Sequence, residues 1–565
     1  MKKYCVKKSP RIYTPIKNLA HLIEQLRERG ARPAFKYVKG REFATMTAQE
    51  FATMATRVAA GLRAAGLEGK RVAIIGETSP EWVATYLGTI ASGGVAIPMD
   101  KELAISEIEG FLAGVDAEAI VYSASFNEKL APAKENHPTL KKFIPLVGEQ
   151  DEKTLPFAEL QQLGAKEIEA GYVLPERDTE ALATMLFTSG TTGTSKCVML
   201  CEKNTVSCVN AACASVNFSD KDVLLSVLPI HHTYELAIML AALTLGAFIG
   251  INDSLRHLMR NIAEIRPTGL ILVPLFVSTI YKRIMDKARK AGKDKLLERM
   301  IPVANGLRAV GIDARRKIFA SVHEAFGGRL EKIICGGAAL NPELVRKFDA
   351  FGIQICEGYG ITECSPLIAV NPYFANKPGS VGPAVPRCEA RIAATGKNDL
   401  GFDEGEIQAK GDNVMMGYYN NDEANAAAFT EDGWYRTGDV GYIDADGYIH
   451  ITGRLKSVIV LESGKNVFPE EIEEYLEDIG EIAESVVVGR KAEDSDAVIL
   501  TAVVYPNKDA FPEGTSKEEI YLTIYNKIME QNKRVASFKK ILALELRDEE
   551  FEKTTSKKIK RHLVK

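Results

Sequence analysis

Apolar residues along the chain alternate between helical spacing and short continuous runs. Helical spacing covers residues 16–29 and 47–65. The continuous runs, which are typical of buried strands, lie at residues 71–75, 95–98, 119–122, 223–228, 269–273 and 332–335. Because strands that alternate with helical segments form parallel βαβ units, the pattern predicts an α/β fold.

The pattern changes in the last third of the chain. From about residue 391 to 451, short strands are separated by glycine turns such as Asp444–Gly447, which favours a β-rich barrel or meander. A smaller α+β segment follows, in which Pro469 is well suited to open a helix. We therefore expect two domains, at residues 1–454 and 455–565.

One apolar stretch, residues 236–251, raises the question of a membrane span. It falls short of the roughly 20 residues that cross a bilayer as a helix. Thr244 and Gly246 also interrupt it. We expect a buried helix there, and peripheral membrane contact stays open.

Composition bounds the class of protein. The 565 residues exceed what one hydrophobic core serves, and the hydrophobic share of 46% is that of an ordinary globular enzyme. The formal net charge of −4 provides no broad basic field, so nucleic acid is not an expected partner. The nine cysteines contain no CxxC pair, which argues against a zinc site or a disulfide framework and favours a reducing cytoplasm.

The most informative segment is residues 188–196, which read TSGTTGTSK between two apolar runs. Glycines let backbone N–H groups approach an anion, hydroxyls donate hydrogen bonds, and the lysine adds a positive charge. The candidate phosphate-binding residues are Thr188, Ser189, Gly190, Thr191, Thr192, Gly193 and Lys196. A Walker A loop is excluded because Ser195 stands where glycine is required and Cys197 follows the lysine.

This loop resembles the phosphate loop of the adenylate-forming enzymes, the superfamily of acyl-CoA synthetases, adenylation domains and luciferases, whose pattern is close to TSGTTGxPKG. The chain departs from that pattern at Ser195 and Cys197. Further segments resemble the other motifs of the superfamily and follow in its order. They are LPIHHTYE at 228–235, CGGAAL at 335–340, EGYGITE at 357–363, YRTGD at 435–439, GRLKS at 453–457 and KTTSKKIKR at 553–561.

The resemblance implies a role for each central motif. His232 matches the histidine that lines the carboxylate-binding pocket, Thr362 matches the hydroxyl for the α-phosphate, and Glu363 matches the Mg²⁺ ligand. The residues matched to the adenine side are Gly336, Gly337, Ala338, Glu357, Tyr359 and Gly360. The ring of Tyr359 is expected to stack on the base.

The later motifs imply a ribose site and a moving C-terminal domain. Asp439 matches the carboxylate that accepts hydrogen bonds from both ribose hydroxyls, and Arg454 matches a ribose and phosphate contact. Lys456 stands at the hinge position, and Lys558 falls on the catalytic lysine. The implied fold is a large N-terminal domain of α/β layers with a β-barrel-like subdomain, followed by a small mobile α+β domain.

The implied activity is a ligase reaction in two steps that uses ATP, Mg²⁺ and coenzyme A. ATP activates a carboxylic acid as an acyl-adenylate, and a thiol then takes the acyl group. The tail resembles the T-x-T-x-K-I-K-R form of the long-chain fatty acyl-CoA synthetases, and residues 272–284 resemble a VPR-type segment of long-chain members. A fatty acid is therefore the expected substrate.

Other activities within the superfamily stay open. An acyl-carrier-protein ligase and an adenylate-only ligase share every motif with a fatty acid–CoA ligase, so a carrier protein remains a candidate partner. A luciferase-like oxidoreductase is a more distant alternative, because no segment of the chain signals oxygen chemistry.

Overall fold

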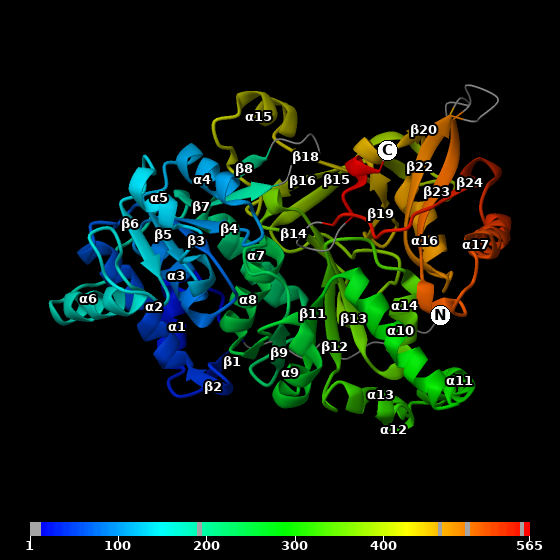
Figure 1. The fold of residues 1–565 in the computed structure, drawn as a ribbon, viewed down its shortest axis with the longest axis horizontal. Coiled ribbons are helices and arrows are strands. Elements are labelled where there is room, and N and C mark those ends of the chain that lie inside the picture. The colour runs from blue at the N-terminus through cyan, green and yellow to red at the C-terminus, as the bar shows by residue number, and fades with distance from the viewer. Residues whose placement is uncertain (1–12, 189–194, 462–465, 492–497, 554–558, 565) are drawn as a thin grey trace. The chain divides into compact units, whose positions relative to one another are not determined.

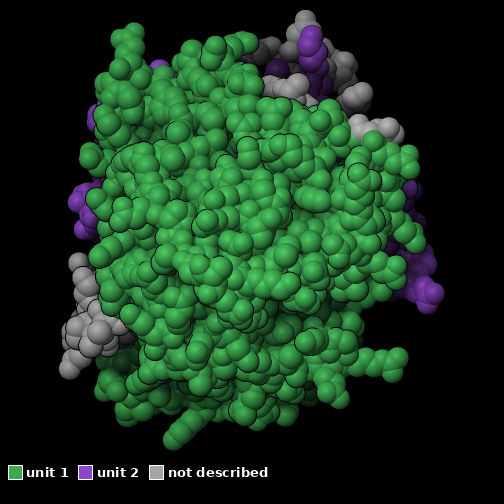
Figure 2. All heavy atoms as spheres, turned by 90° about the vertical axis from the view of Figure 1, so that its left-hand side faces the viewer, with its two compact units in different colours: residues 1–337, 343–389, 409–435 green, residues 338–342, 390–408, 436–565 purple. Residues whose placement is uncertain are grey.

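The structure is a computed structural model of the chain, and it describes residues 13–188, 195–461, 466–491, 498–553 and 559–564. The chain divides into two compact units (Figure 2). The first unit contains residues 1–337, 343–389 and 409–435. The second contains residues 338–342, 390–408 and 436–565. Each unit is described by itself below, and the expected division between residues 454 and 455 stays a prediction.

One sheet of the first unit has seven strands in the order β17-β8-β7-β4-β3-β5-β6 (Figure 1). The strands are β3 (Arg71–Ile75), β4 (Val95–Met99), β5 (Ala119–Tyr122), β6 (Lys142–Pro145), β7 (Leu182–Thr188), β8 (Lys196–Cys201) and β17 (Gly417–Tyr418). The run from β7 to β6 is parallel, and β8 pairs antiparallel with both β7 and β17. The helices in this part of the chain are α1 (Leu19–Glu28), α2 (Ala48–Ala64), α3 (Pro80–Ala91), α4 (Ile105–Gly114), α5 (Ala131–Asn136), α6 (Phe157–Glu169) and α7 (Glu202–Ser215).

The other large sheet has eight strands in the order β14-β13-β12-β11-β9-β10-β1-β2. The strands are β1 (Pro33–Lys39), β2 (Glu42–Thr47), β9 (Val223–Ser226), β10 (Phe248–Ile251), β11 (Gly269–Leu272), β12 (Lys332–Gly336), β13 (Gln354–Gly360) and β14 (Leu367–Val370). All neighbours pair parallel except the outer strands β2 and β14. The helices that accompany it are α8 (Thr233–Leu245), α9 (Leu258–Ile265), α10 (Pro274–Lys290), α11 (Asp294–Ala309), α12 (Arg315–Ile318), α13 (Ala320–Ala325) and α14 (Pro342–Phe351).

The central strands are buried on both faces, which explains their continuous apolar runs. Every residue of β4 and of β5 is buried, and Ile97, Ile120 and Phe143 share one cluster of the hydrophobic core. A parallel sheet buries both faces because its crossover helices cover them. The expected α/β organisation of this part of the chain is confirmed.

The helix expected at residues 236–251 is only partly correct. Helix α8 covers Thr233–Leu245 and ends at Gly246, whose φ of 75° is left-handed and therefore suits glycine. The remaining apolar residues form the strand β10. Apolar content alone does not distinguish a buried helix from a buried strand.

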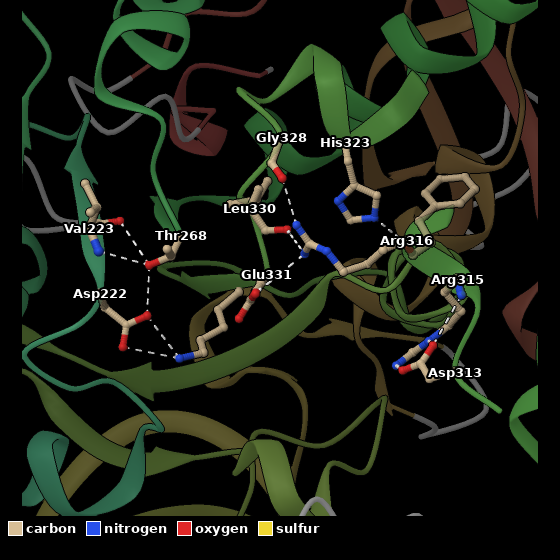
Figure 3. Close-up of polar contacts among 12 residues, drawn as sticks. Asp222, Val223, Thr268, Asp313, Arg315, Arg316, His323, Gly328, Leu330 and Glu331 are labelled. Carbon is tan, nitrogen blue, oxygen red and sulfur yellow. Dashed lines mark hydrogen bonds and ion pairs between the residues drawn. The ribbon is translucent and has the colours of Figure 1, made fainter. Parts of the chain in front are cut away.

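The amino-terminal edge of the eight-stranded sheet is held by a polar network (Figure 3). The carboxylate of Asp222 accepts hydrogen bonds from Thr268 Oγ1 at 2.8 Å and from Lys332 Nζ at 3.1 Å. Nearby, the guanidinium of Arg316 donates to the carbonyls of Gly328 and Leu330. Because this network satisfies the polar groups that precede β9, β11 and β12, this edge serves stability.

The second unit contains two larger sheets and a small ribbon. The strands β15 (Cys388–Lys397), β16 (Asp403–Gly411), β18 (Tyr435–Ile443) and β19 (Ile449–Arg454) form a four-stranded sheet. The ribbon pairs β20 (Ile459–Val460) with β21 (Asn466–Val467). The strands β22 (Ile482–Lys491), β23 (Val498–Pro506) and β24 (Ile541–Leu546) form a third sheet, which packs with α16 (Pro469–Glu477) and α17 (Lys517–Gln531) around one hydrophobic core.

Two local expectations for the second unit are confirmed. Pro469 is the first residue of α16, where its missing N–H costs no hydrogen bond. The turn between β18 and β19 places Gly447 at a φ of 81°, and Asp444 Oδ1 accepts from the backbone N–H of Asp446 and Tyr448. Across the described ranges, no helix is both long and apolar enough to cross a membrane.

Candidate active site

Three of the expected motifs lie at the carboxyl edge of the eight-stranded sheet. The segment 228–235 follows β9, Gly337 follows β12, and Thr362 follows β13. These strands are parallel, so their carboxyl ends share one edge. In open α/β sheets this edge is where ligands bind.

Tyr234, in the first turn of α8, fastens that helix to the edge. Its hydroxyl shares one proton between two acceptors, the carbonyls of Leu272 at 3.3 Å and Ile334 at 3.2 Å. Gly336 allows this approach, because a Cβ there would lie 3.0 Å from Gly358 O and 3.3 Å from the Tyr234 ring. The small residue at 336 therefore has an intramolecular packing role beside the adenine contact expected for it.

Glycine is required even more strictly at position 360. A Cβ on Gly360 would lie 1.7 Å from the carbonyl oxygen of Pro366, so the strand pair β13–β14 forbids a side chain there. Gly337 has a φ of 92°, which favours glycine for conformational reasons. Glu357 and Tyr359 lie on β13 and are buried.

A chain of contacts joins the end of the phosphate loop to the proposed metal ligand. Lys196 opens β8, and its ammonium lies 4.7 Å from the ring centroid of Tyr418. Tyr418 lies on β17, next to β8, and its hydroxyl donates to Glu363 Oε1 at 2.8 Å. The structure thus brings Lys196 to the ring and Glu363 to the hydroxyl of one tyrosine, although the two residues are 167 positions apart in the chain.

Sequence reasoning missed Tyr418. Burial raises the pKa of its hydroxyl, and the nearby Glu363 carboxylate raises it further. The hydroxyl therefore keeps its proton and remains a donor to Glu363. Burial likewise raises the pKa of Tyr435, whose hydroxyl lies 3.4 Å from that of Tyr418. The only sequence signal was an aromatic pair at 418–419 that no motif claimed.

The donor set around Glu363 fits a magnesium ion that is held mainly by phosphate. Among the residues that the structure describes, no group of three or more His, Cys, Asp or Glu side chains is arranged so that it could hold a metal ion. Glu363 is half-buried, and Tyr418 fixes one of its oxygens. Mg²⁺ commonly takes one or two carboxylates and completes its shell with phosphate oxygens and water.

The histidine pair that follows β9 of the eight-stranded sheet faces the seven-stranded sheet. His231 is buried, and its Nε2 lies 3.5 Å from the carboxylate of Asp100, which follows β4. His232 caps the amino end of α8, with its ring centroid 4.2 Å from that of His231. The carboxyl ends of β9 and β4 therefore meet here, and His231, which no motif had claimed, makes the contact.

Glu235 is a fully buried acid in the first turn of α8. It accepts a hydrogen bond from Ser226 Oγ at the end of β9. Burial raises the pKa of Glu235 to about 8, although the hydrogen bonds from Ser226 and from the Leu228 backbone lower it. At neutral pH the carboxyl is therefore largely protonated, which removes the cost of a buried charge.

The expected ribose residues lie side by side in the second unit. Asp439 on β18 pairs in register with Arg454 on β19, and Asp439 Oδ1 lies 3.1 Å from Arg454 Nε. Asp439 is buried, while the side chain of Arg454 is half exposed. Lys456 lies in the short helical turn Leu455–Ser457 and is exposed. Ala338 also belongs to this unit.

Several expected residues fall outside the described ranges. They are Ser189, Gly190, Thr191, Thr192, Gly193 and Lys558. Thr188, at the end of β7, is described, and its Oγ1 lies 3.4 Å from the carbonyl oxygen of Lys196. The two ends of the candidate phosphate loop are thus held together by the β7–β8 pair.

Comparison with known proteins identifies the family. Residues 22–419 match the profile described as AMP-binding enzyme, and residues 456–565 match the profile described as AMP-binding enzyme C-terminal domain. The long-chain-fatty-acid–CoA ligase FadD15 of Mycobacterium bovis is 30% identical over 466 residues, with 79% of this chain and 75% of that protein covered. A chloroplastic long-chain-fatty-acid–acyl-carrier-protein ligase of Arabidopsis thaliana is 27% identical, with 83% and 74% covered.

A solved structure supports the same assignment. ATP-bound MatB from Rhodopseudomonas palustris superimposes with a TM-score of 0.75 at 26% identity, covering 97% of this chain and 98% of that one. The mixed α/β architecture with a large N-terminal part and a smaller C-terminal part is that of the adenylate-forming enzymes. The chain therefore belongs to the AMP-binding enzyme family.

Proposed function

We propose that the protein is a fatty acid–CoA ligase that forms AMP. The carboxylate of a long- or medium-chain fatty acid attacks the α-phosphorus of ATP, and pyrophosphate leaves. The thiol of coenzyme A then attacks the carbonyl carbon of the acyl-adenylate, and AMP leaves.

The observation that carries this proposal is the Lys196–Tyr418–Glu363 contact chain. It links a cation at the end of the phosphate loop to a carboxylate at the carboxyl edge of the eight-stranded sheet. A nucleoside triphosphate needs both, because its phosphates require a cation and its metal requires a carboxylate. Here one side chain, that of Tyr418, contacts both the Lys196 cation and the Glu363 carboxylate.

Catalysis in the first step consists mainly of placing two anions together. Lys196 and the hydroxyls of the loop would neutralise the β- and γ-phosphates, and Thr362 with Lys558 would face the α-phosphate. Bound Mg²⁺ would supply further positive charge on the phosphate oxygens, held by Glu363. His232 would stand beside the carboxylate of the acid.

Recognition of the nucleoside would use the adenine-side and ribose residues. Gly336, Gly337 and Gly360 would present backbone atoms to the base, and Asp439 with Arg454 would bind the ribose hydroxyls. In the described state the Arg454 guanidinium occupies one oxygen of Asp439. A ribose would share that carboxylate with Arg454.

The assignment of the substrate and of the acyl acceptor rests on similarity to relatives. The relatives named above act, by their names, on long-chain fatty acids, with CoA or acyl-carrier protein as acceptor. Because the C-terminal motif also resembles that of the long-chain members, we assign the protein as a fatty acid–CoA ligase. We also propose that residues 455–565 move about Lys456 between the two steps, and that the reaction takes place in a reducing cytoplasm, in line with eight buried thiols among the described cysteines.

A screen of purified enzyme tests the function. Pyrophosphate release is measured with carboxylic acids of increasing chain length, each with and without CoA, and the products are identified by mass spectrometry. We expect release with fatty acids, and acyl-CoA only when CoA is present. Release with aromatic or short dicarboxylic acids alone would refute the fatty acid assignment.

A carrier protein is the second candidate acceptor. It is favoured by the similarity to the acyl-carrier-protein ligase of Arabidopsis thaliana. Replacing CoA by phosphopantetheinylated carrier protein in the same assay distinguishes the two. Acylated carrier protein formed faster than acyl-CoA would reassign the acceptor and leave the adenylation step unchanged.

A further inference from the structure

The C-terminal segment of the second unit turns back on itself before the chain ends. Lys553 and Ile559 form an antiparallel bridge, and the N–H of Lys560 donates to Glu552 O at 2.8 Å. The described residues on either side of 554–558 are thus paired like the two strands of a hairpin. Lys558 directly precedes the bridged residue Ile559 in the chain.

The outgoing side of this hairpin is held by an acid on α16. The guanidinium of Arg561 donates to Glu473 Oε2, and its Nε lies 3.7 Å from Glu470 Oε1. The other oxygen of Glu473 accepts from the backbone N–H of Val487 on β22 at 2.6 Å. Burial raises the pKa of Glu473 to about 7, and Arg561 is the largest influence in the other direction. Arg561 therefore favours the charged form of this carboxyl, against the effect of burial.

The incoming side is held by an acid on β22. The ammonium of Lys553 pairs with Glu484 Oε1, and the other oxygen of Glu484 accepts from the N–H of Phe551 at 3.0 Å. Both side chains of the Lys553–Glu484 pair are largely buried. Glu550 lies 2.8 Å from Lys553 on the more exposed side.

Apolar contacts complete the attachment. Phe551 packs with Val486 of β22 and Val503 of β23, and Ile559 packs against the same cluster. Both sides of the hairpin therefore contribute an apolar side chain to the β22–β23 sheet, while the Lys553 cation pairs with β22 and the Arg561 cation pairs with α16. Two largely buried acids with every oxygen bonded in this way fix a position more than they add stability, because burying charged pairs costs much of what their attraction returns.

We propose that Glu473 and Glu484 are positioning residues for Lys558. They hold Lys553 and Arg561, which are described residues on either side of the segment of the sequence that contains Lys558. The inference rests on the proposed function, in which Lys558 acts only in adenylation. Neither acid contacts substrate, so each acts through the hairpin.

The test uses full-length variants and both half-reactions. Glu473→Gln removes the charge of the acid and keeps its size, and Arg561→Gln removes the charge of its partner and shortens the side chain. Acid-dependent ATP–pyrophosphate exchange should fall on the order of 100-fold, since displacement of a reacting group by about 1 Å costs that much. Conversion of supplied acyl-adenylate and CoA into acyl-CoA should stay within about twofold, because that step does not use Lys558.

Three further variants sharpen the result. Arg561→Lys keeps the charge and should recover most of the exchange rate, while the Glu473→Gln, Arg561→Gln double variant should be no worse than either single one. The matched control is Asp548→Asn, which removes an exposed ion pair with Lys517 in the same unit and should change neither half-reaction. If Glu473→Gln does not fold, Arg561→Gln and Arg561→Lys decide the question alone. The Arg561 side chain is partly exposed, so its replacement is expected to leave the fold intact.

The outcomes separate this inference from the function on which it rests. Full exchange activity in Arg561→Gln, together with lost exchange in Lys558→Ala, would overturn the positioning role alone. Equal losses in both half-reactions with a lowered melting temperature would also overturn it, since they show general destabilisation. Full exchange activity in Lys558→Ala would instead overturn the proposed catalytic assignment.

Discussion

At the scale of single residues, Tyr418 organises the described part of the candidate site. Its ring faces the Lys196 ammonium, and its hydroxyl holds Glu363. Because burial and Glu363 both raise the pKa of the hydroxyl, the tyrosine donates and does not compete as an anion. One side chain thus sets the orientation of two groups that would bind opposite charges.

Replacing Tyr418 by phenylalanine tests that arrangement. The ring contact with Lys196 stays, while a hydrogen bond to a carboxylate worth roughly 1.5–3 kcal/mol is lost. We expect ATP–pyrophosphate exchange to fall about 10-fold or more and to need a higher Mg²⁺ concentration. Tyr419→Phe is the matched control, because that hydroxyl accepts from Arg71. Equal effects of the two variants would contradict the role of Tyr418.

The buried acid Glu235 predicts a pH-dependent stability. Its pKa of about 8 in the folded chain lies above the ordinary value of 4.5. The folded state therefore binds the proton more tightly, so this group's contribution is complete below pH 4.5 and is lost as the pH rises through about 8. The loss is at most about 1.4 kcal/mol per pH unit.

Glu235→Gln does not titrate and should remove that loss. Denaturant unfolding at pH 5, 7 and 9 should show that the free energy of unfolding of the variant rises relative to that of the wild type as the pH rises. The exposed residue Glu149 supplies the control Glu149→Gln, whose difference from wild type should not depend on pH. A constant difference for Glu235→Gln across the three pH values would refute a shifted pKa.

At the scale of elements, glycines control how closely the strands and α8 approach at the carboxyl edge. Gly336 admits the Tyr234 ring, and Gly360 admits the backbone of Pro366. These contacts hold the ends of β12 and β13 and the first turn of α8 in one place. The motif segments at 228–235 and 357–363 acquire their mutual geometry from this packing.

A methyl group at position 360 should break that geometry. Gly360→Ala places a Cβ 1.7 Å from Pro366 O, so β13 or β14 must shift, at a cost of about 1–3 kcal/mol or more. We expect a lower melting temperature and a loss of adenylation larger than the loss of stability explains. The matched control is Gly110→Ala in α4, where no atom lies within 4 Å and alanine should stabilise the helix slightly. Unchanged adenylation in Gly360→Ala would contradict the account.

The elements that could be predicted from sequence are those whose ends are marked by turn residues. The strands at residues 71–75 and 119–122 match β3 and β5, because turn residues bound short apolar runs there. The stretch 236–251 was misjudged, since its uniform apolar content hides the change from α8 to β10 at Gly246. Tyr418 could not be found from sequence, because its place depends on β17 pairing with β8 more than 200 residues earlier.

At the scale of the whole molecule, the candidate functional groups divide between the two units. The first unit contains Lys196, Glu363 and His232, and the second contains Asp439 and Arg454. The C-terminal hairpin that precedes and follows residues 554–558 also belongs to the second unit. A reaction that needs Lys558 in one step and a thiol in the next suits this division, because domain movement can exchange the groups that face the adenylate.

The most direct test of the central claim compares the two half-reactions in the wild type and in Lys558→Ala. The wild type should catalyse ATP–pyrophosphate exchange that requires a fatty acid and does not require CoA. Lys558→Ala should lose that exchange and still convert supplied acyl-adenylate and CoA into acyl-CoA and AMP. Unchanged exchange in Lys558→Ala, or no acid-dependent exchange in the wild type, would contradict the account.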